Sequence, residues 1–285
     1  MTLAKVLCMG EKELETAGVP EAKLNAWYLF SHSFAVDGIP MDRGGFFLRR
    51  DEKADAAVIR YYENLLKKRA KRIPLEYIIR ETEFMGLPFY VDERVLIPRQ
   101  DTECLVEEVL KICEGRDILD LCTGTGCIGI SLAVLGKCRS VTLSDISDGV
   151  LQVAEHNAVM NQAAVTLVKS DLFQSVEGDF DVIVSNPPYI PTSEIDTLMP
   201  EVRDHEPKEA LDGKGDGLFF YRSIIEKSRM FLREKGTLHF EIGCDQGEAV
   251  ACLMEQAGFS GIEIKKDLAG LDRIVQGVCR TGGEC

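Results

Sequence analysis

The chain has 285 residues, 45% of them apolar, which is enough to bury the core of one large domain or two ordinary ones. Its 33 basic and 47 acidic residues give a formal net charge of −14, which excludes a generally basic surface for binding phosphates. Ten cysteines are scattered through apolar segments, and no stretch reaches the roughly 18 apolar residues of a membrane span. We therefore expect a globular cytoplasmic protein that contacts neither membrane nor nucleic acid directly.

The first part of the chain has a helical pattern. In "EKADAAVIRYYENLLKKRAKR", residues 52–72, apolar side chains recur at steps of three and four, which predicts an amphipathic helix. Earlier segments have a similar pattern, and none of them carries a cluster of reactive side chains. We predict a helical domain over residues 1–72 and hypothesise that it recognises the substrate.

The pattern changes between residues 73 and 99. In "PLEYIIRETEFMGLPFYVDERVLIPR", residues 74–99, β-branched and aromatic residues flank the turn signal "MGLP". This arrangement predicts a β-hairpin connector over residues 73–99.

From residue 100 to residue 285, short apolar runs alternate with helical stretches. The runs are "DILDLC", "SVTLSD", "VTLVKS", "FDVIVS", "GTLHFEIG", "GIEIKK" and "DRIVQGVC". Such alternation predicts an α/β fold, a Rossmann-like and mostly parallel sheet with helices on both faces. A short loop separates the last two runs, so we expect them to form an antiparallel hairpin at one edge of the sheet.

A glycine-rich turn follows the first of these runs. In "DLCTGTGCIG", Gly124, Gly126 and Gly129 match the G-x-G-x-x-G pattern between a strand and a helix. Ligands of open parallel sheets bind beyond the carboxyl ends of the strands, where this turn is expected. The glycines alone are a weak signal, because they also serve backbone geometry in turns of this kind.

The next two strand ends carry carboxylates. Asp145 lies 21 residues after Gly124, where it can accept both hydroxyl groups of a ribose. It could instead cap the following helix, although Ser147 is also available for that task. Asp171 precedes Leu172 and Phe173, and it could accept an exocyclic amine beside these apolar groups, which could sandwich an adenine, or it could act as an N-cap. A dinucleotide and S-adenosylmethionine both fit these turns.

The fourth run ends in Asn186-Pro187-Pro188-Tyr189. An amide or aromatic amine is a poor nucleophile, so a catalyst that methylates it has to orient its nitrogen. The Asn186 side-chain oxygen and the Pro187 carbonyl can each accept one N–H of such a group, while the Tyr189 ring stacks on it. The prolines stiffen the loop and lack N–H groups that would compete. An ordinary Asn-Pro turn is the simpler alternative, and it leaves the coincidence of four aligned turns unexplained.

With these residues the sequence resembles the class I S-adenosylmethionine-dependent methyltransferases, and most closely the release factor glutamine methyltransferase family. The resemblance covers nearly the whole chain. Its narrower motifs are "FMGLPFYVDERVLIPRQDTE", "DLCTGTGCIGIS", "SDLF", "NPPYI", "EPKEALDGKGDGL", "EIGCDQG" and "KDLAGLDRIV". It implies transfer of a methyl group to the N5 side-chain nitrogen of the glutamine in the Gly-Gly-Gln motif of peptide chain release factors, with S-adenosyl-L-homocysteine as the second product.

The resemblance also implies roles for individual residues. The catalytic residues would be Asn186, Pro187 and Tyr189, and the substrate glutamine would contact Asn186, Pro187, Pro188, Tyr189, Glu206 and Pro207. The cofactor would contact Arg99, Thr102, Asp120, Cys122, Thr123, Gly124, Thr125, Gly126, Asp145, Ile146, Asp171, Leu172 and Asn186. No metal is implied.

Two positions depart from the family pattern. Cys122 stands where many relatives have glycine, and Gln100 replaces a common proline. We expect Cys122 to be tolerated as a small packing residue without a catalytic role.

Four other functions share part of this pattern. A nucleic-acid amino methyltransferase would share the glycine loop and the Asn186–Tyr189 segment, but it would be expected to carry a basic surface. A ribosomal protein glutamine methyltransferase would present the same site to the same side chain. An NAD-dependent oxidoreductase would account for the glycines but not for the Asn186–Tyr189 segment. A binding protein without activity would not need a suitable residue at every position where the reaction requires one.

Overall fold

The computed structural model describes residues 1–35 and 40–279, which form two compact units. The first unit comprises Met1–Arg80 together with Met199–His205, and the second begins at Glu81 and contains the rest of the described chain. The end of the predicted domain 100–285, residues 280–285, lies outside the described residues. Within those ranges, no helix is long and apolar enough to cross a bilayer.

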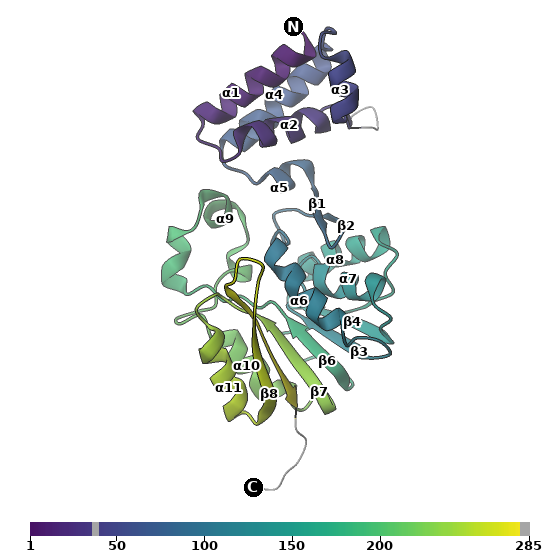
Figure 1. The fold of residues 1–285 in the computed structure, drawn as a ribbon, viewed down its shortest axis with the longest axis vertical. Coiled ribbons are helices and arrows are strands. Elements are labelled where there is room, and N and C mark those ends of the chain that lie inside the picture. Colours follow the sequence, from purple (N-terminus) through teal and green to yellow (C-terminus); the bar gives the residue numbers. More distant parts are fainter. Residues whose placement is uncertain (36–39, 280–285) are drawn as a thin grey trace. The chain divides into compact units, whose positions relative to one another are not determined.

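The first unit is a bundle of helices (Figure 1). Its helices are α1 (Leu3–Thr16), α2 (Ala22–His32), α3 (Arg43–Arg49), α4 (Ala56–Ala70), α5 (Leu75–Ile79) and the distant α9 (Pro200–His205). The Thr2 and Asp55 side chains cap α1 and α4 by accepting backbone N–H groups of the first turn. Buried aromatic residues Phe30 and Tyr62 meet edge to face in the core, where the Tyr62 hydroxyl donates to the Ala26 carbonyl.

An acidic residue of α9 joins that helix to the end of α4 within this unit. The Glu201 carboxylate pairs with Arg69 at 2.9 Å and with Arg72 at 2.6 Å. The Asn25 side-chain oxygen accepts a further bond from Arg69. The segment Met199–His205 therefore belongs to the helical unit although it comes more than a hundred residues later in the chain, which periodicity cannot predict.

The segment predicted as a connector contains both a helix and a hairpin. Its start forms α5, which groups with the helical unit, so the boundary between the units falls at Arg80, after the predicted boundary at residue 72. Strands β1 (Glu81–Phe84) and β2 (Leu87–Tyr90) then pair antiparallel around the predicted turn. The side chain of Asn157 fastens β2 to the rest of the second unit by binding both backbone groups of Tyr90.

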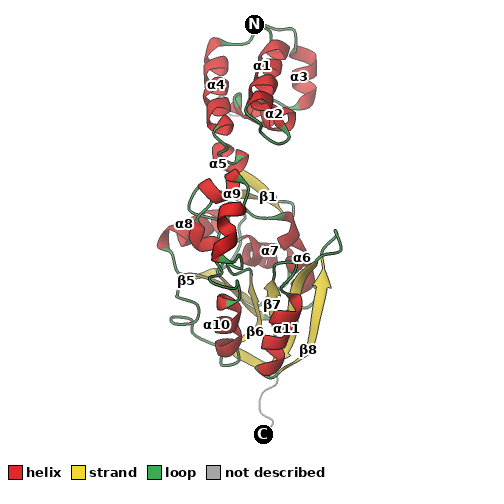
Figure 2. Cartoon of the chain, turned by 90° about the vertical axis from the view of Figure 1, so that its left-hand side faces the viewer, coloured by secondary structure: helices red, strands yellow, loops and turns green. Residues whose placement is uncertain are grey.

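The second unit is built on a seven-stranded sheet, and strands are drawn in yellow in Figure 2. The strand order is β5-β4-β3-β6-β7-β9-β8. Its strands are β3 (Asp117–Leu121), β4 (Ser140–Asp145), β5 (Thr166–Lys169), β6 (Phe180–Ser185), β7 (Leu232–Glu241), β8 (Phe259–Lys266) and β9 (Asp272–Cys279). The first five are parallel, and β8 and β9 form an antiparallel hairpin at the edge. The predicted α/β, Rossmann-like fold with a helical N-terminal part is confirmed.

Helices cover both faces of this sheet. On one face, α6 (Gln100–Leu110), α7 (Cys127–Leu135) and α8 (Asp148–Met160) pack on a core around Ile118 and Val184. On the other, α10 (Phe219–Ser228) and α11 (Gly247–Gln256) pack on a core around Leu119 and Ile183. Alternate residues of β3 and β6 thus face opposite cores, as two-sided burial of a parallel sheet requires. Two 3₁₀ helices, η2 (Thr192–Thr197) and η3 (Lys208–Ala210), flank α9.

Candidate functional site

The glycine loop runs from the end of β3 to the start of α7. Gly124 and Gly126 have φ values of 56° and 82°, in the left-handed region that glycine adopts without strain. A Cβ added to Gly126 would lie 2.7 Å from Ile130, whereas one added to Gly124 would meet nothing within 4 Å. The loop is therefore tightly packed at Gly126 and has open space at Gly124, as a site for a nucleoside-containing cofactor needs.

Cys122, the departure from the family pattern, also has a positive φ of 58°. Glycine, which the family pattern implies at this position, would adopt this conformation without strain. Burial raises the pKa of the Cys122 thiol to about 12, although a hydrogen bond with Ser185 acts to lower it. The thiol is therefore protonated at neutral pH and is a poor nucleophile.

Buried polar side chains beneath the loop hold its shape. The Asp120 carboxylate accepts bonds from the Thr123 hydroxyl at 2.6 Å and from the Gly129 N–H at 3.0 Å. Asp120 has no exposed surface, and this burial raises its pKa to about 7. The Thr125 hydroxyl accepts the N–H of Cys127. The structure thus places Asp120 and Thr125, both predicted to contact cofactor, as buried supports of the loop.

Asp145, at the end of β4, lies against the glycine loop. Its carboxylate accepts the Gly124 N–H at 3.1 Å and the Ser147 N–H at 3.2 Å. The N-cap of α8 is Ser147, so Asp145 does not cap that helix. Burial raises the pKa of Asp145. The next residue, Ile146, is 62% exposed.

Asp171 and Leu172 follow β5. The exposed Asp171 carboxylate accepts the side-chain amide of Gln174, and Leu172 has a φ of 49°. The structure has a turn here and no helix, so Asp171 is not a helix cap. The backbone N–H of the neighbouring Ser170 donates to the Asp145 carbonyl, which links this turn to the preceding strand end.

The Asn186–Tyr189 segment begins directly after β6, beside the same edge of the sheet. The Asn186 side-chain nitrogen donates to the Thr102 hydroxyl, with 3.3 Å between the two atoms. Both prolines are buried and Tyr189 is half-buried. The Tyr189 carbonyl accepts a bond of 2.9 Å from the Gln246 side chain.

A loop from the motif "EPKEALDGKGDGL" braces this segment. Ile190 forms a bridge with Asp212, donating its N–H to Leu211 and accepting that of Gly213. A Cβ on Gly213 would lie 2.7 Å from the Tyr189 backbone, and one on Gly217 would lie 2.4 Å from the Tyr189 carbonyl oxygen. These glycines allow the two backbones to approach each other, so the motif sets the position of Tyr189.

Arg99 and Glu206 pair with each other. Their side chains form an ion pair of 2.5 Å, and the Glu206 side chain is almost fully buried. Pro207, half-buried, then leads into η3. The resemblance assigned Arg99 to the cofactor and Glu206 to the substrate, and the structure brings the two together.

Sequence reasoning gave no role to Glu241, Arg273 or Gln246, which lie in the same region. Glu241 ends β7 and is buried, and Arg273 on β9 pairs with Asp101 and Asp267. The family motifs "EIGCDQG" and "KDLAGLDRIV" contain these three residues, so the motifs are the feature of the sequence that could have indicated them.

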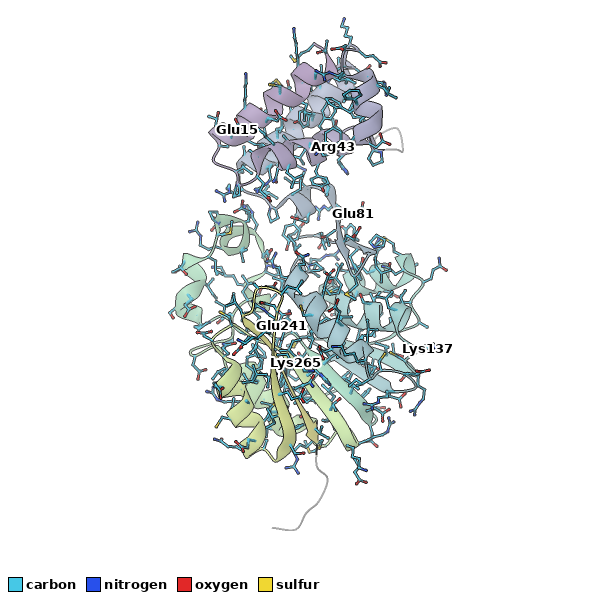
Figure 3. All side chains as sticks on the ribbon, viewed as in Figure 1. Glu15, Arg43, Glu81, Lys137, Glu241 and Lys265 are labelled. Carbon is cyan, nitrogen blue, oxygen red and sulfur yellow. The ribbon has the colours of Figure 1, made fainter. Side chains whose placement is uncertain are left out.

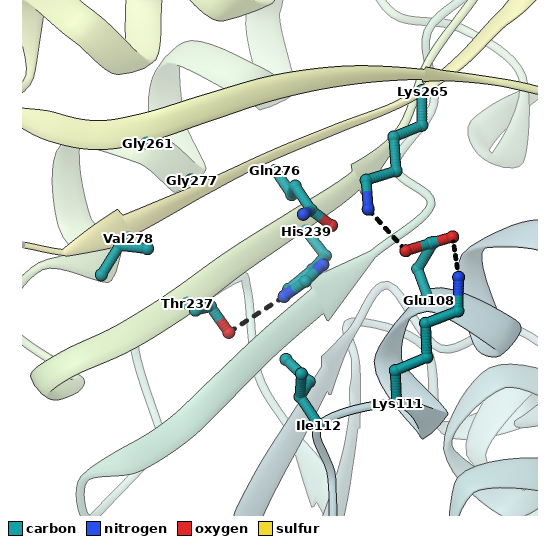
Figure 4. Close-up of a pocket in the computed structure, with 10 residues that line it drawn as sticks. All are labelled: Glu108, Lys111, Ile112, Thr237, His239, Gly261, Lys265, Gln276, Gly277 and Val278. Atoms are coloured by element: carbon teal, nitrogen blue, oxygen red, sulfur yellow. Dashed lines mark hydrogen bonds and ion pairs between the residues drawn. The ribbon is translucent and has the colours of Figure 1, made fainter.

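A cavity of about 200 Å³ lies elsewhere in the second unit, between the end of α6 and the strands β7, β8 and β9 (Figure 4). Glu108 bridges Lys111 and Lys265 along it, and His239 points toward it from β7. None of the predicted site residues lines this cavity. It is therefore separate from the edge of the sheet where the glycine loop and Asn186 lie.

Comparison with known proteins assigns the family. The family described as Methyltransferase small domain matches residues 99–216, and the family described as PrmC N-terminal domain matches residues 5–79. A release factor glutamine methyltransferase of Geobacter sulfurreducens is 39% identical, over 97% of this chain and 96% of its own. One of Clostridium botulinum is 36% identical, over 97% and 99%.

A solved methyltransferase from Pyrococcus furiosus has the same kind of fold. Its TM-score is 0.55 at 17% identity, with 75% of this chain and 98% of that chain covered. This likeness concerns the fold alone, whereas the sequence relatives match both parts of the chain at high coverage. The chain belongs to the release factor glutamine methyltransferase family.

Proposed function

We propose that this protein transfers the methyl group of S-adenosyl-L-methionine to the N5 side-chain nitrogen of a glutamine in peptide chain release factors. Family membership supports the reaction class, because the relatives named above carry that activity in their names. The observation that carries the proposal for this chain is the position of Asn186. Its amide lies at the end of β6 with its nitrogen bonded to Thr102, beside the strand end that carries the glycine loop.

The donor would be held by the glycine loop and the two strand ends that follow it. The open space over Gly124 and the Asp145 carboxylate suit a ribose-bearing ligand. Asp171, Leu172 and Ile146 would line the adenine side, and Arg99 and Thr102 would lie toward the methionine end. When bound, S-adenosylmethionine supplies an electrophilic methyl group, and the remaining product is S-adenosyl-L-homocysteine.

The chain's own contribution is to orient the substrate amide. The Asn186 side-chain oxygen and the Pro187 carbonyl each accept one N–H of the glutamine NH₂ group, and the Tyr189 ring packs against its plane. The rigid Pro187-Pro188 backbone keeps these acceptors in place. Alignment of this kind can supply about 7–11 kcal/mol of the barrier.

No general base is needed for this reaction. The amide nitrogen is strongly acidic once it is alkylated, so its extra proton leaves to solvent. The neutral Cys122 thiol does not compete with the substrate nitrogen for the methyl group, because burial raises its pKa to about 12.

The substrate would be the Gly-Gly-Gln loop of a release factor, and the reaction would take place in the cytoplasm. Glu206 and Pro207 would lie near the entrance for this loop. The helical domain would recognise the body of the release factor, since it presents no reactive cluster of its own, and no nucleic acid would take part directly. If so, KM should be much lower for an intact release factor than for a short glutamine peptide, and equal values would mean that the helical domain has no role in recognition.

Mass spectrometry of a purified release factor incubated with the protein and isotopically labelled S-adenosylmethionine tests the proposal. The expected product carries one labelled methyl group on the glutamine amide nitrogen. A release factor with glutamic acid at that position is the matched control and should stay unlabelled. Labelling of a ribosomal protein or of RNA in place of the release factor would overturn the assignment.

A further inference from the structure

Glu241 lies directly beside Asn186 at the carboxyl end of the sheet. Strands β6 and β7 are parallel with Ser185 opposite Phe240, so Asn186 and Glu241 are the next residues along the two strands. Glu241, labelled in Figure 3, is the last residue of β7 and is 1% exposed. The Tyr221 hydroxyl fixes its backbone by donating to the Glu241 carbonyl at 2.8 Å.

The Glu241 carboxyl group is influenced by two side chains, those of Thr102 and Asn186. The Thr102 and Asn186 side chains both act to lower the pKa of this carboxyl group, and these two are joined by the 3.3 Å bond between them. Its second oxygen, Oε2, is buried without a hydrogen-bond partner among the described residues. A buried carboxyl with a free oxygen is costly for folding, which points to a role in the site.

The chemistry of a carboxylate decides which end of the Asn186 amide faces it. An ionised carboxylate can only accept hydrogen bonds, so it selects the NH₂ end of the amide. This is the orientation in the structure, where the Asn186 nitrogen is turned toward Thr102. The side-chain oxygen of Asn186 is then left for the N–H group of a substrate. A protonated Glu241 could donate to that oxygen and compete with the substrate.

We infer that Glu241 is a positioning residue that holds the Asn186 amide with its oxygen directed at the substrate nitrogen. The inference rests on the proposed function and deepens it, because it assigns the determinant of the Asn186 orientation to a residue of the neighbouring strand. Accepting from the Asn186 nitrogen also polarises the amide and makes its oxygen a stronger acceptor.

The protonation of Glu241 changes near neutral pH. Burial raises its pKa to about 7, while hydrogen bonding from Thr102 and Asn186 and the charge of Arg273 lower it, and Asp101 raises it further. The other titratable groups that face Glu241 are Tyr189, Tyr221 and Cys127, whose own pKa values lie far above neutrality. The productive orientation of Asn186 should therefore be favoured as the pH rises through about 7.

The decisive measurement is an NMR titration of the Asn186 side-chain amide in the full-length protein without donor or substrate. Its two ¹H–¹⁵N signals can be assigned because they are absent from the Asn186→Asp variant. In the wild-type protein they should shift with an apparent pKa near 7, and in Glu241→Gln the shift should be lost. Glu241→Asp retains a carboxylate and should retain a titration. The Asp120→Asn variant is the matched control, because the pKa of Asp120 is also about 7 and its removal should leave the Asn186 titration in place.

The kinetic arm separates positioning from structural support. In Glu241→Gln, kcat should fall roughly 10- to 100-fold and lose its dependence on pH near 7, while the affinity for S-adenosylhomocysteine stays unchanged. A wild-type Asn186 signal that does not titrate, or one that titrates equally in Glu241→Gln, would overturn the inference. A wild-type protein that fails to methylate a release factor would instead contradict the proposed function, whatever the NMR titration shows.

Discussion

The backbone N–H of Gly124 donates to the Asp145 carboxylate, with 3.1 Å between nitrogen and oxygen. This bond joins the glycine loop after β3 to the end of the neighbouring strand β4. The other carboxylate oxygen accepts the N–H of Ser147. Asp145 therefore fixes the loop that would hold the donor, in addition to offering acceptors to a ribose.

We predict that Asp145→Ala weakens binding of S-adenosylhomocysteine by about 1.5–3 kcal/mol, because hydrogen bonds to a charged group are lost. Asp145→Asn should cost less, since one acceptor oxygen remains for the Gly124 N–H or for the ribose. Isothermal titration calorimetry measures both variants. NAD titrated into the wild-type protein is the control, and tight NAD binding with no response to S-adenosylhomocysteine would contradict the assigned cofactor.

Gly213 and Gly215 give a matched pair of substitutions in one loop. A Cβ on Gly213 would press on the Tyr189 backbone at 2.7 Å, whereas one on Gly215 would meet nothing within 4 Å. We therefore expect Gly213→Ala to displace the Tyr189 backbone and to lower kcat by about 100-fold, since a misplacement of about 1 Å costs that much. Gly215→Ala should leave kcat close to the wild-type value.

Donor affinity distinguishes this effect from general unfolding. S-adenosylhomocysteine should bind Gly213→Ala as tightly as the wild-type protein, because the substitution does not touch the glycine loop or Asp145. Equal kcat values for the Gly213 and Gly215 variants would show that the loop does not set the position of Tyr189.

Glu201 stabilises the helical domain through its pairs with Arg69 and Arg72. Burial acts to raise the pKa of Glu201, but the hydrogen bonds from Arg72 and Arg69 outweigh it and lower the pKa to about 2. We expect Glu201→Gln to lower the free energy of unfolding at pH 7 by about 2 kcal/mol, less than the full shift implies because solvent partly screens these pairs.

The pH dependence of this loss has a definite sign. A carboxyl whose pKa is lower in the folded state stabilises the protein above its unfolded pKa of about 4.5 and loses that contribution as the pH falls through about 2. The difference between the wild-type protein and Glu201→Gln in urea unfolding should therefore be full at pH 7 and smaller at pH 3. The exposed Glu15 offers a control substitution, Glu15→Gln, which should change stability little at either pH.

The sequence predicts the sheet well because its signals are local. The apolar runs of β3 and β6 and the turn residues Gly124 and Gly126 have the spacing and composition of the elements they form. The α/β fold and the edge hairpin of β8 and β9 follow from such patterns.

The remaining features depend on contacts between distant residues. Nothing in the composition of Met199–His205 indicates that this segment packs with the helical domain. The packing depends on ion pairs of Glu201 with Arg69, in the last turn of α4, and with Arg72, just after that helix. The place of Glu241 beside Asn186 likewise follows from the order of β6 and β7 in the sheet. The sequence contains the motif "EIGCDQG" around Glu241, but the sequence does not show that Asn186, on the neighbouring strand, lies beside it.

The orienting role proposed for Asn186 makes the sharpest prediction for the reaction. Asn186→Ala removes one of two acceptors for the glutamine NH₂ group, and loss of a comparable pre-positioned group costs on the order of 3–4 kcal/mol in rate. The loss should appear mainly in kcat. Asn186→Asp should bind donor and turn over slowly, because it keeps an acceptor of similar volume but replaces the NH₂ end that Thr102 accepts with a second oxygen beside Glu241.

Two substitutions of Tyr189 separate the contribution of its ring from that of its hydroxyl group. Burial raises the pKa of its hydroxyl to about 12, so the ring is neutral in the working range of pH. Tyr189→Phe keeps the stacking face and should retain much more activity than Tyr189→Ala, which loses it. Single-turnover rates with a Gly-Gly-Gln peptide, followed by mass spectrometry of the product, measure all four variants. A near wild-type rate for Asn186→Ala, or a methyl group on any atom other than the glutamine amide nitrogen, would show that this amide does not orient the substrate.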